Sequence, residues 1–262
     1  MIRWKGLLTT VLMVCLAWTA GCAGVQRVAA DVLIPIEEEN RLGEELSREI
    51  DKELTFHPDA EVLRYVRDLG ASILQHVPNS PRGIRYRFVV VDDRDTINAF
   101  AIPGGHIYVY SGLLRAMDNE AELAAVLSHE IAHVTRRQVA QRLVAAYGAE
   151  AVARMALGEE PGLIAQLVTA VVAQGFMLRY SRDQERDADE WGLQYQVNAN
   201  YNPEAFLTFF RKLGGSPSPP TFLSTHPSPE DRIEYMRQWI REISPRPTRL
   251  EEERFLRIRA RL

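Results

Sequence analysis

The sequence predicts one α+β domain that is mostly helical and contains a small β-sheet. Three observations support this prediction. Apolar residues recur at helical spacing over most of the chain after residue 36, and the β-branched and aromatic runs that predict strands lie within residues 86–110. No segment recurs as a helix-pair repeat. With 262 residues, of which 46% are hydrophobic and 25% charged, the chain has the composition of an ordinary globular domain.

Residues 1–21 have the character of an export signal. Two basic residues near the start precede the apolar run 6–20, which is too short to cross a bilayer as a stable helix. The run ends in Thr-Ala-Gly-Cys, which resembles a bacterial lipobox, with Thr19 where leucine is typical. We therefore expect Cys22 to begin the mature chain and to carry lipid. A plain secretory signal cut nearby and an uncleaved anchor are the alternatives.

Cysteine and charge content narrow the chemistry of the mature chain. Both cysteines, Cys15 and Cys22, lie in the signal region, so no thiol remains for a disulfide. A metal would have to be held by His, Asp or Glu, which favours a catalytic zinc over a closed Cys-rich site. The formal net charge of −4 becomes −6 when Arg3 and Lys5 leave with the signal. Without a basic run, nucleic acid is not an expected partner.

The first half of the domain should supply two helices and the sheet. After a linker over 22–35, apolar residues at helical spacing predict helices over 36–54 and 58–77. Three strands should follow, the last two joined by a Pro-Gly-Gly turn: 86–91, 98–102 and 106–110.

The second half should be helical. Ser111 is expected to cap a short helix, and Asp118 or Asn119 to cap a longer helix that runs unbroken from Ala121 to Gln138. Three further helices and an Ala-rich helical stretch interrupted at 158–162 complete the domain, which we place at 36–243: 139–178, 181–196, 203–213 and 227–243. A Gly/Ser/Pro loop is expected over 214–220 and a charged tail over 244–262.

The long helix contains His-Glu-Ile-Ala-His, a match to the H-E-x-x-H zinc pattern. His129 and His133 are four residues apart, so both can point at one ion from the same helix face. Glu130 lies about 100° around the helix and can reach a water on that ion. Two surface histidines on an ordinary helix remain the alternative unless a third ligand exists.

The third ligand is sought among five carboxylates between residues 183 and 190. One helix face carries two of them together with two very small residues: Glu185, Ala188, Asp189 and Gly192. That face can pack closely against the Ala-rich zinc helix, so Glu185 is the proposed ligand, and Asp189 would accept a hydrogen bond from a ligand histidine. The other three carboxylates should form a solvated face: Asp183, Asp187 and Glu190. An acidic helix start favoured by the macrodipole is the alternative.

These motifs, together with Asn-Ala-Phe-Ala-Ile-Pro-Gly-Gly-His-Ile-Tyr before the zinc helix, resemble the HtpX-type gluzincin metalloendopeptidases. That family includes CAAX prenyl endopeptidases and periplasmic beta-barrel assembly-enhancing proteases. The resemblance implies a zincin-like metallopeptidase fold and one Zn²⁺ per chain, bound by His129, His133 and Glu185. It also implies Glu130 as the catalytic base and Asp189 as a supporting or proton-donating residue.

The resemblance further identifies His226 and Arg232 in the late His-Pro segment as oxyanion donors, and His226 could instead occupy the position of the water in a latent enzyme. The other histidines are expected to be unrelated to the site. His57 and His76 should be surface residues, and His106 a surface or packing residue.

Polypeptides are the expected substrates, added as an extended strand beside four residues: Asn98, Ala99, Phe100 and Ala101. The chain lacks the multiple membrane spans and the C-terminal repeat module found elsewhere in the family, so it resembles the small lipid-anchored members. Ala23 after Cys22 favours the outer membrane of a bacterial envelope, facing the periplasm. The alternatives are a zinc-stabilised, chaperone-like binder of unfolded envelope proteins and a structural lipoprotein without metal.

Overall fold

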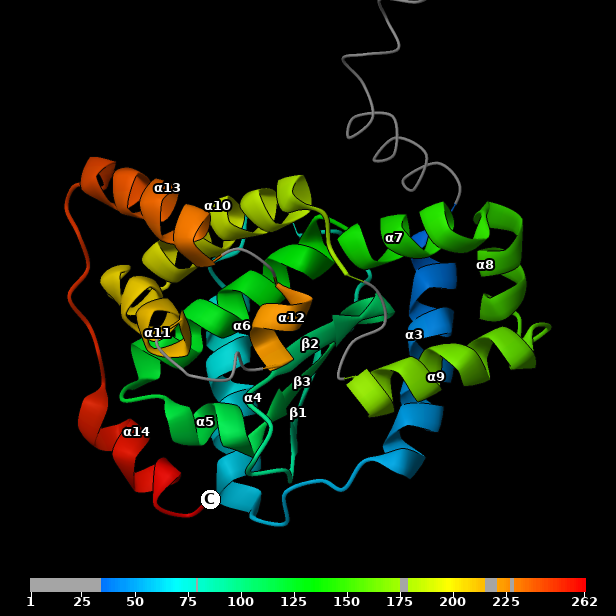
Figure 1. Cartoon of the computed structure of the whole chain (residues 1–262), viewed down its shortest axis with the longest axis horizontal. Coiled ribbons are helices and arrows are strands. Elements are labelled where there is room, and N and C mark those ends of the chain that lie inside the picture. Colours follow the sequence, from blue (N-terminus) through cyan, green and yellow to red (C-terminus); the bar gives the residue numbers. More distant parts are fainter. Residues whose placement is uncertain (1–33, 79, 175–178, 215–220, 227–228) are drawn as a thin grey trace, which may run out of the picture.

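The computed structural model describes residues 34–78, 80–174, 179–214, 221–226 and 229–262. The expected signal, the expected lipid site Cys22 and nearly all of the loop expected at 214–220 lie outside these ranges. In Figure 1, helices α3, α8 and α9 lie at one end of the molecule and α11, α13 and α14 at the other, with the sheet and α6 between them.

The three predicted strands are present, with bounds within one residue of those expected: β1 Arg87–Val91, β2 Ala99–Ile102 and β3 His106–Tyr110. They form one sheet in the order β1-β3-β2. Strand β3 is parallel to β1 and antiparallel to β2. The turn between β2 and β3 is the short 3-10 helix η1, Pro103–Gly105. Gly104 and Gly105 have φ values of 75° and 89°, which explains why glycines occupy this turn.

Both faces of the sheet are covered by helices. Alternate side chains of β3 point to opposite sides, so that Ile107 and Val109 join one hydrophobic cluster and Tyr108 and Tyr110 the other. The first cluster is completed by helices α4 (Ala60–Leu74) and α6 (Glu120–Thr135), and the second by α3 (Ile36–Glu53) and α9 (Pro161–Gln174). Because the sheet is enclosed, its strands are apolar on both faces.

Two predicted helix starts can be compared with the structure. Asn119 caps α6 by accepting a hydrogen bond from the Glu122 amide, as one of the two sequence alternatives proposed. The prediction for Ser111 was wrong. Tyr110 is the N-cap of α5 (Ser111–Ala116), and its side chain makes no capping bond. Ser111 lies one residue inside that helix, where its hydroxyl cannot serve as the cap.

The prediction of an unbroken zinc helix to residue 138 was also wrong. Helix α6 ends at Thr135, because Arg137 adopts a left-handed conformation with φ 55° and ψ 30°, and α7 (Gln138–Tyr147) begins directly after it. The Ala-rich stretch contains a second unpredicted break at Gly148, φ 83°, between α7 and α8 (Ala149–Ala156).

The C-terminal half adds five helices: α10 Arg182–Asn198, α11 Glu204–Gly214, α12 Thr221–Thr225, α13 Pro229–Glu242 and α14 Glu252–Arg259. The predicted capping box of Ser181 and Gln184 at the start of α10 is confirmed. Helices α12 and α14 were not predicted. Phe255 of α14 is fully buried in the core, so the charged C-terminal segment is part of the packed structure.

The length and composition of the helices were compared with those of membrane-spanning helices. Within the described ranges no single helix is long and apolar enough to span a bilayer, although α8 and α9 pass the same test as a pair bent by 91°.

Candidate metal centre

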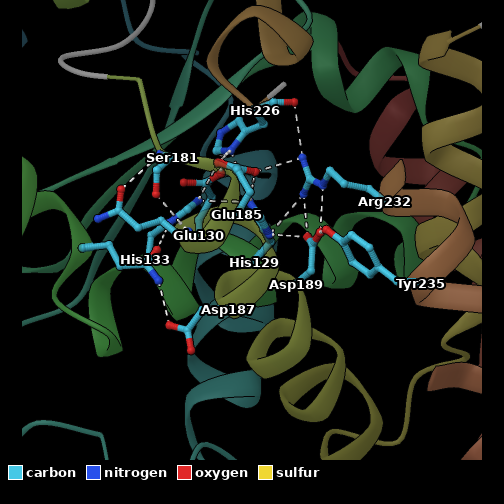
Figure 2. Close-up of polar contacts among 12 residues, drawn as sticks. His129, Glu130, His133, Ser181, Glu185, Asp187, Asp189, His226, Arg232 and Tyr235 are labelled. Atoms are coloured by element: carbon cyan, nitrogen blue, oxygen red, sulfur yellow. Dashed lines mark hydrogen bonds and ion pairs between the residues drawn. The ribbon is translucent and has the colours of Figure 1, made fainter. Parts of the chain in front are cut away.

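Helix α6 carries the first half of the site. It passes through the middle of the molecule, and all its residues from Glu120 to Val134 are buried. His129 and His133 point the same way because they are one helical turn apart, and their Nε2 atoms lie 3.0 Å from each other. Figure 2 shows both rings directed at a carboxylate from α10. The alternative of two surface histidines is therefore wrong, since their exposed fractions are 1% and 0%.

Helix α10 can come this close because of Gly192. A Cβ atom at that position would lie 3.0 Å from both the Cα and the backbone nitrogen of His129. Ala188, on the same face, is fully buried against the same neighbour. The close packing of α10 on α6 brings Glu185, also buried, into the space between the two imidazoles.

Four potential ligands converge at this point, and their donor atoms all lie within 4.8 Å of one another: His129, His133, Glu185 and His226. The Glu185 carboxylate lies 3.5 Å from the Nε2 of His129 and 3.6 Å from that of His133. His226, immediately after α12, places its Nδ1 2.9 Å from Glu185 Oε1 and 3.2 Å from His129 Nε2. A tetrahedral zinc site with bonds of about 2.0–2.1 Å has ligand–ligand separations of about 3.3–3.4 Å. The observed spacings match that geometry.

The hydrogen bonds around the two helix histidines are compatible with a cation between them. The Nδ1 of His129 lies 3.0 Å from Asp189 Oδ1, and the Nδ1 of His133 lies 2.6 Å from Gln138 Oε1. Since both acceptors take a proton from Nδ1, neutral rings present two Nε2 lone pairs to each other at 3.0 Å. A bound divalent ion removes this repulsion, so the donor set fits a metal.

Arg232 and Tyr235 of α13 hold Asp189 in place. The Arg232 Nε and NH2 groups donate to its two oxygens at 2.8 and 2.5 Å, and the Tyr235 hydroxyl donates to Oδ2. Burial opposes ionisation of Asp189, but the Arg232 charge and the His129 hydrogen bond bring its pKa below the ordinary value. Burial likewise lowers the pKa of His129, but the bonds to Asp189 and Glu185 outweigh it and raise that pKa to about 9.

Glu130 differs from the other carboxylates of the centre. Both its oxygens are buried, and neither has a hydrogen-bond partner within the described ranges; the Nε2 atom of His226 lies 3.4 Å from Oε1. Burial raises the pKa of Glu130, and the nearby charges of His226, His129 and Arg232 offset this effect only in part. A buried carboxyl with a raised pKa and free oxygens is suited to accept and return a proton.

The structure brings together every predicted metal-site residue: His129, Glu130, His133, Glu185, Asp189, His226 and Arg232. The four residues predicted to bind substrate are not among them. Asn98, Ala99, Phe100 and Ala101 lie at the end of the sheet order, in or next to β2, and their side chains are all buried. Only the backbone of this strand edge is therefore suited to contact a ligand.

Two of the sequence expectations about other polar residues were wrong. Asp187, expected on a solvated face, is half-buried and accepts hydrogen bonds from Arg136 and Gln138. His57, expected at the surface, is buried, whereas His76 is exposed as predicted. His106 is a packing residue within the sheet.

Three contacts at the centre were missed at the sequence level. Gln138 binds His133, Tyr235 binds Asp189, and the Tyr180 ring stacks on His133 with ring centroids 3.7 Å apart. Tyr235 follows Arg232 by three residues and so shares its helix face, which is the one signal that could have identified it.

The fold and the site together define a metallopeptidase-type domain, in which an H-E-x-x-H helix and a second helix share one metal centre. Comparison with known proteins gives the same class: the model of Peptidase family M48 matches residues 58–240. The chain belongs to Peptidase family M48.

Curated relatives include the beta-barrel assembly-enhancing protease of Escherichia coli K12, 29% identical over 243 residues, which cover 87% of this chain and 49% of that protein. A putative protease of the same name from Vibrio cholerae is 34% identical over 174 residues, 61% of this chain and 36% of the relative. The mitochondrial metalloendopeptidase OMA1 of Schizosaccharomyces pombe is 32% identical over 163 residues, which cover 61% of this chain and 48% of that protein. The chain thus spans about half the length of the E. coli relative.

Proposed function

We propose that this protein is a zinc-dependent metalloendopeptidase with one Zn²⁺ per chain, held by His129, His133 and Glu185. The observation that supports this most strongly is the convergence of two imidazoles and one carboxylate at tetrahedral spacing, next to a buried Glu130 with free oxygens. Nitrogen and oxygen donors with a separate acid–base carboxylate are the composition of a catalytic zinc site.

Zinc held there would supply a Lewis acid that polarises the scissile carbonyl and lowers the pKa of a water molecule to about 7. Glu130 takes the proton of the attacking water and returns it to the leaving amine, for which its raised pKa is suited. Asp189 keeps the proton of His129 on Nδ1, so that Nε2 faces the ion.

His226 is better placed than Arg232 to act as an oxyanion donor. Arg232 is held by Asp189 and lies 2.9 Å from Glu185 Oε2, so its guanidinium serves mainly to position these carboxylates. His226 has a ring nitrogen among the potential ligands, a position that favours the latent alternative, in which it takes the place of the water. Moved off the ion, the same ring is available to stabilise the oxyanion.

The substrate is an extended polypeptide that pairs with the backbone of β2 beside residues 98–101. This strand ends the sheet order, and in the described part of the chain its outer edge has no partner strand. Main-chain pairing reads sequence loosely, which suits a protease of varied polypeptides.

We further propose that Cys22 carries lipid and anchors the enzyme in a bacterial cell envelope, facing the periplasm from the outer membrane. The Thr-Ala-Gly-Cys sequence and Ala23 support the anchor. The name of the bacterial relatives supports the envelope as the compartment, with misfolded or unassembled envelope proteins as substrates.

Glu130→Gln tests the proposal. We expect the variant to bind one zinc per chain, because glutamine has nearly the same shape as glutamate and Glu130 is not a ligand. It should cleave unfolded casein at least about 100-fold more slowly than the parent, because the carboxylate that acts as the base is lost. Zinc content is measured by elemental analysis and cleavage by peptide release, with and without chelator. Glu190→Gln, an exposed change of the same chemistry on α10, is the control and should cleave normally. Casein cleavage by Glu130→Gln at the parental rate would contradict the proposal, and a parent that binds zinc and casein without cutting would favour the chaperone-like alternative.

A further inference from the structure

We propose that Gln138 and Asp187 form a positioning pair for His133, in which the Asp187 carboxylate fixes the orientation of the Gln138 amide and the amide fixes the tautomer of the imidazole. The inference rests on the proposed metal centre and names a second support of that centre, separate from the one that Asp189 and Arg232 give to His129.

The argument begins at Asp187, whose carboxylate can only accept hydrogen bonds when ionised. Its Oδ2 atom lies 2.8 Å from Gln138 Nε2 and 2.8 Å from Arg136 Nε. Since a carboxylate attracts the NH2 end of an amide and repels its oxygen, Gln138 has one permitted orientation here. Its Oε1 must face away from Asp187.

In that orientation Oε1 faces His133. It lies 2.6 Å from the Nδ1 atom, and because an amide oxygen cannot donate, Nδ1 must carry the proton. The lone pair of the ring is then on Nε2, the atom directed at His129 and Glu185. A charge on α10, which also carries the third ligand, thus determines which nitrogen of His133 is available to a metal.

Gln138 is placed for this task by the break between α6 and α7. Helical spacing from His133 would not bring a residue five positions later to its ring, but the left-handed Arg137 turns the chain there. The Arg137 side chain is buried, with Nε 2.8 Å from Glu39 Oε2 and a second bond to the Ile34 carbonyl. Contacts with the start of α3 therefore hold the turn that presents Gln138.

The test is the zinc affinity of the folded full-length protein, measured by competition with a chromophoric chelator. We expect Gln138→Leu, which removes both hydrogen bonds at similar size, to bind zinc about 10–100-fold more weakly than the parent. Asp187→Ala should weaken binding in the same direction, and the two changes together should weaken it no more than Gln138→Leu alone. Asp183→Ala, an exposed carboxylate on the same helix, is the matched control and should leave the affinity unchanged.

An exchange of amide and carboxylate separates positioning from packing. Gln138→Glu alone places two carboxylates against each other and should weaken zinc binding. Adding Asp187→Asn restores one donor and one acceptor in reversed order, and should recover most of the affinity. If Gln138→Leu does not fold, as judged by circular dichroism, the zinc affinity of Asp187→Ala tests the inference instead. The Asp187 side chain is only half-buried and contributes little to the hydrophobic core, so its removal should leave the fold intact.

Zinc affinities of Gln138→Leu and Asp187→Ala within twofold of the parent, or no recovery in the exchange, would overturn the inference. A parent that binds no zinc would instead refute the proposed function, so the two failures are distinguishable.

Discussion

His226 lies closer to the ligand cluster than an oxyanion donor needs to. Its Nδ1 is 2.9 Å from Glu185 and 3.2 Å from His129, so that with zinc present it would complete a closed set of four ligands. We expect His226→Ala to raise the rate of casein cleavage several-fold, because a position for water becomes free. Peptide release under saturating zinc is the measurement. A large loss of rate would instead assign His226 to the oxyanion.

His106 offers a test of electrostatics away from the metal. Burial, reinforced by the Arg87 charge, lowers its pKa from 6.5 to about 4. Between these values the unfolded chain binds a proton that the folded chain rejects, so the free energy of unfolding falls as the pH falls from 6.5 to 4. For this group alone the loss is about 2 kcal/mol at pH 5.

The variant His106→Gln should lose that part of the pH dependence. Urea unfolding at pH 7 and pH 5, with chelator throughout, compares it with the parent and with His76→Gln, which changes an exposed histidine. The drop in unfolding free energy between the two pH values should be smaller in His106→Gln alone. An equal drop in all three proteins would show that His106 is protonated in the folded state at pH 5.

Among the elements, the contact between α6 and α10 is the most sensitive to added volume. Gly192→Ala would place a Cβ 3.0 Å from the backbone of His129, which cannot move aside as a flexible side chain would. We expect a loss of about 1–3 kcal/mol in unfolding free energy and weaker zinc binding, since Glu185 shifts with α10. Gly162→Ala, where no atom lies within 4 Å of the new Cβ, is the control and should be neutral. Urea unfolding and zinc titration measure both, and equal results for the two variants would contradict this account of the contact.

Elements with local signals could be predicted from the sequence. The capping box at Ser181 and the Pro-Gly-Gly turn are encoded by adjacent residues, and the structure shows both. The break at Arg137 could not be predicted, because its left-handed backbone is held by Glu39 and Ile34, about a hundred residues away. Helix α14 was missed because its many charges obscure a narrow apolar face.

In the candidate site, too, the residues with a local sequence signal could be predicted and those that depend on distant contacts could not. His129 and His133 follow from one helical turn, and Glu185 and Asp189 from another, so spacing alone grouped them correctly on their helices. Gln138 could not be found this way, since its contact with His133 depends on the end of a helix rather than on its periodicity.

For the whole molecule, metal removal should lower stability. In the proposed function zinc binds only the folded centre, so at a free concentration 100 times the Kd it would add about 2.7 kcal/mol to the free energy of unfolding. For a chain of this size we expect chelation to lower the Tm by about 5–10 °C. Thermal unfolding followed by circular dichroism measures the shift. Glu130→Gln should show the same shift and His133→Ala almost none; an equal shift in His133→Ala would mean that the stabilising ion binds elsewhere.

The centre is assembled from residues far apart in the chain: His226 contacts a residue 97 positions earlier, and Arg232 one 103 positions earlier. During synthesis the HEIAH helix leaves the ribosome well before these partners exist. A nascent chain that ends before residue 226 has only two of the three imidazoles of the cluster, and it lacks the guanidinium that orients Asp189 and neighbours Glu185. An unfinished copy of the chain therefore lacks part of the set of side chains that surrounds the candidate metal centre.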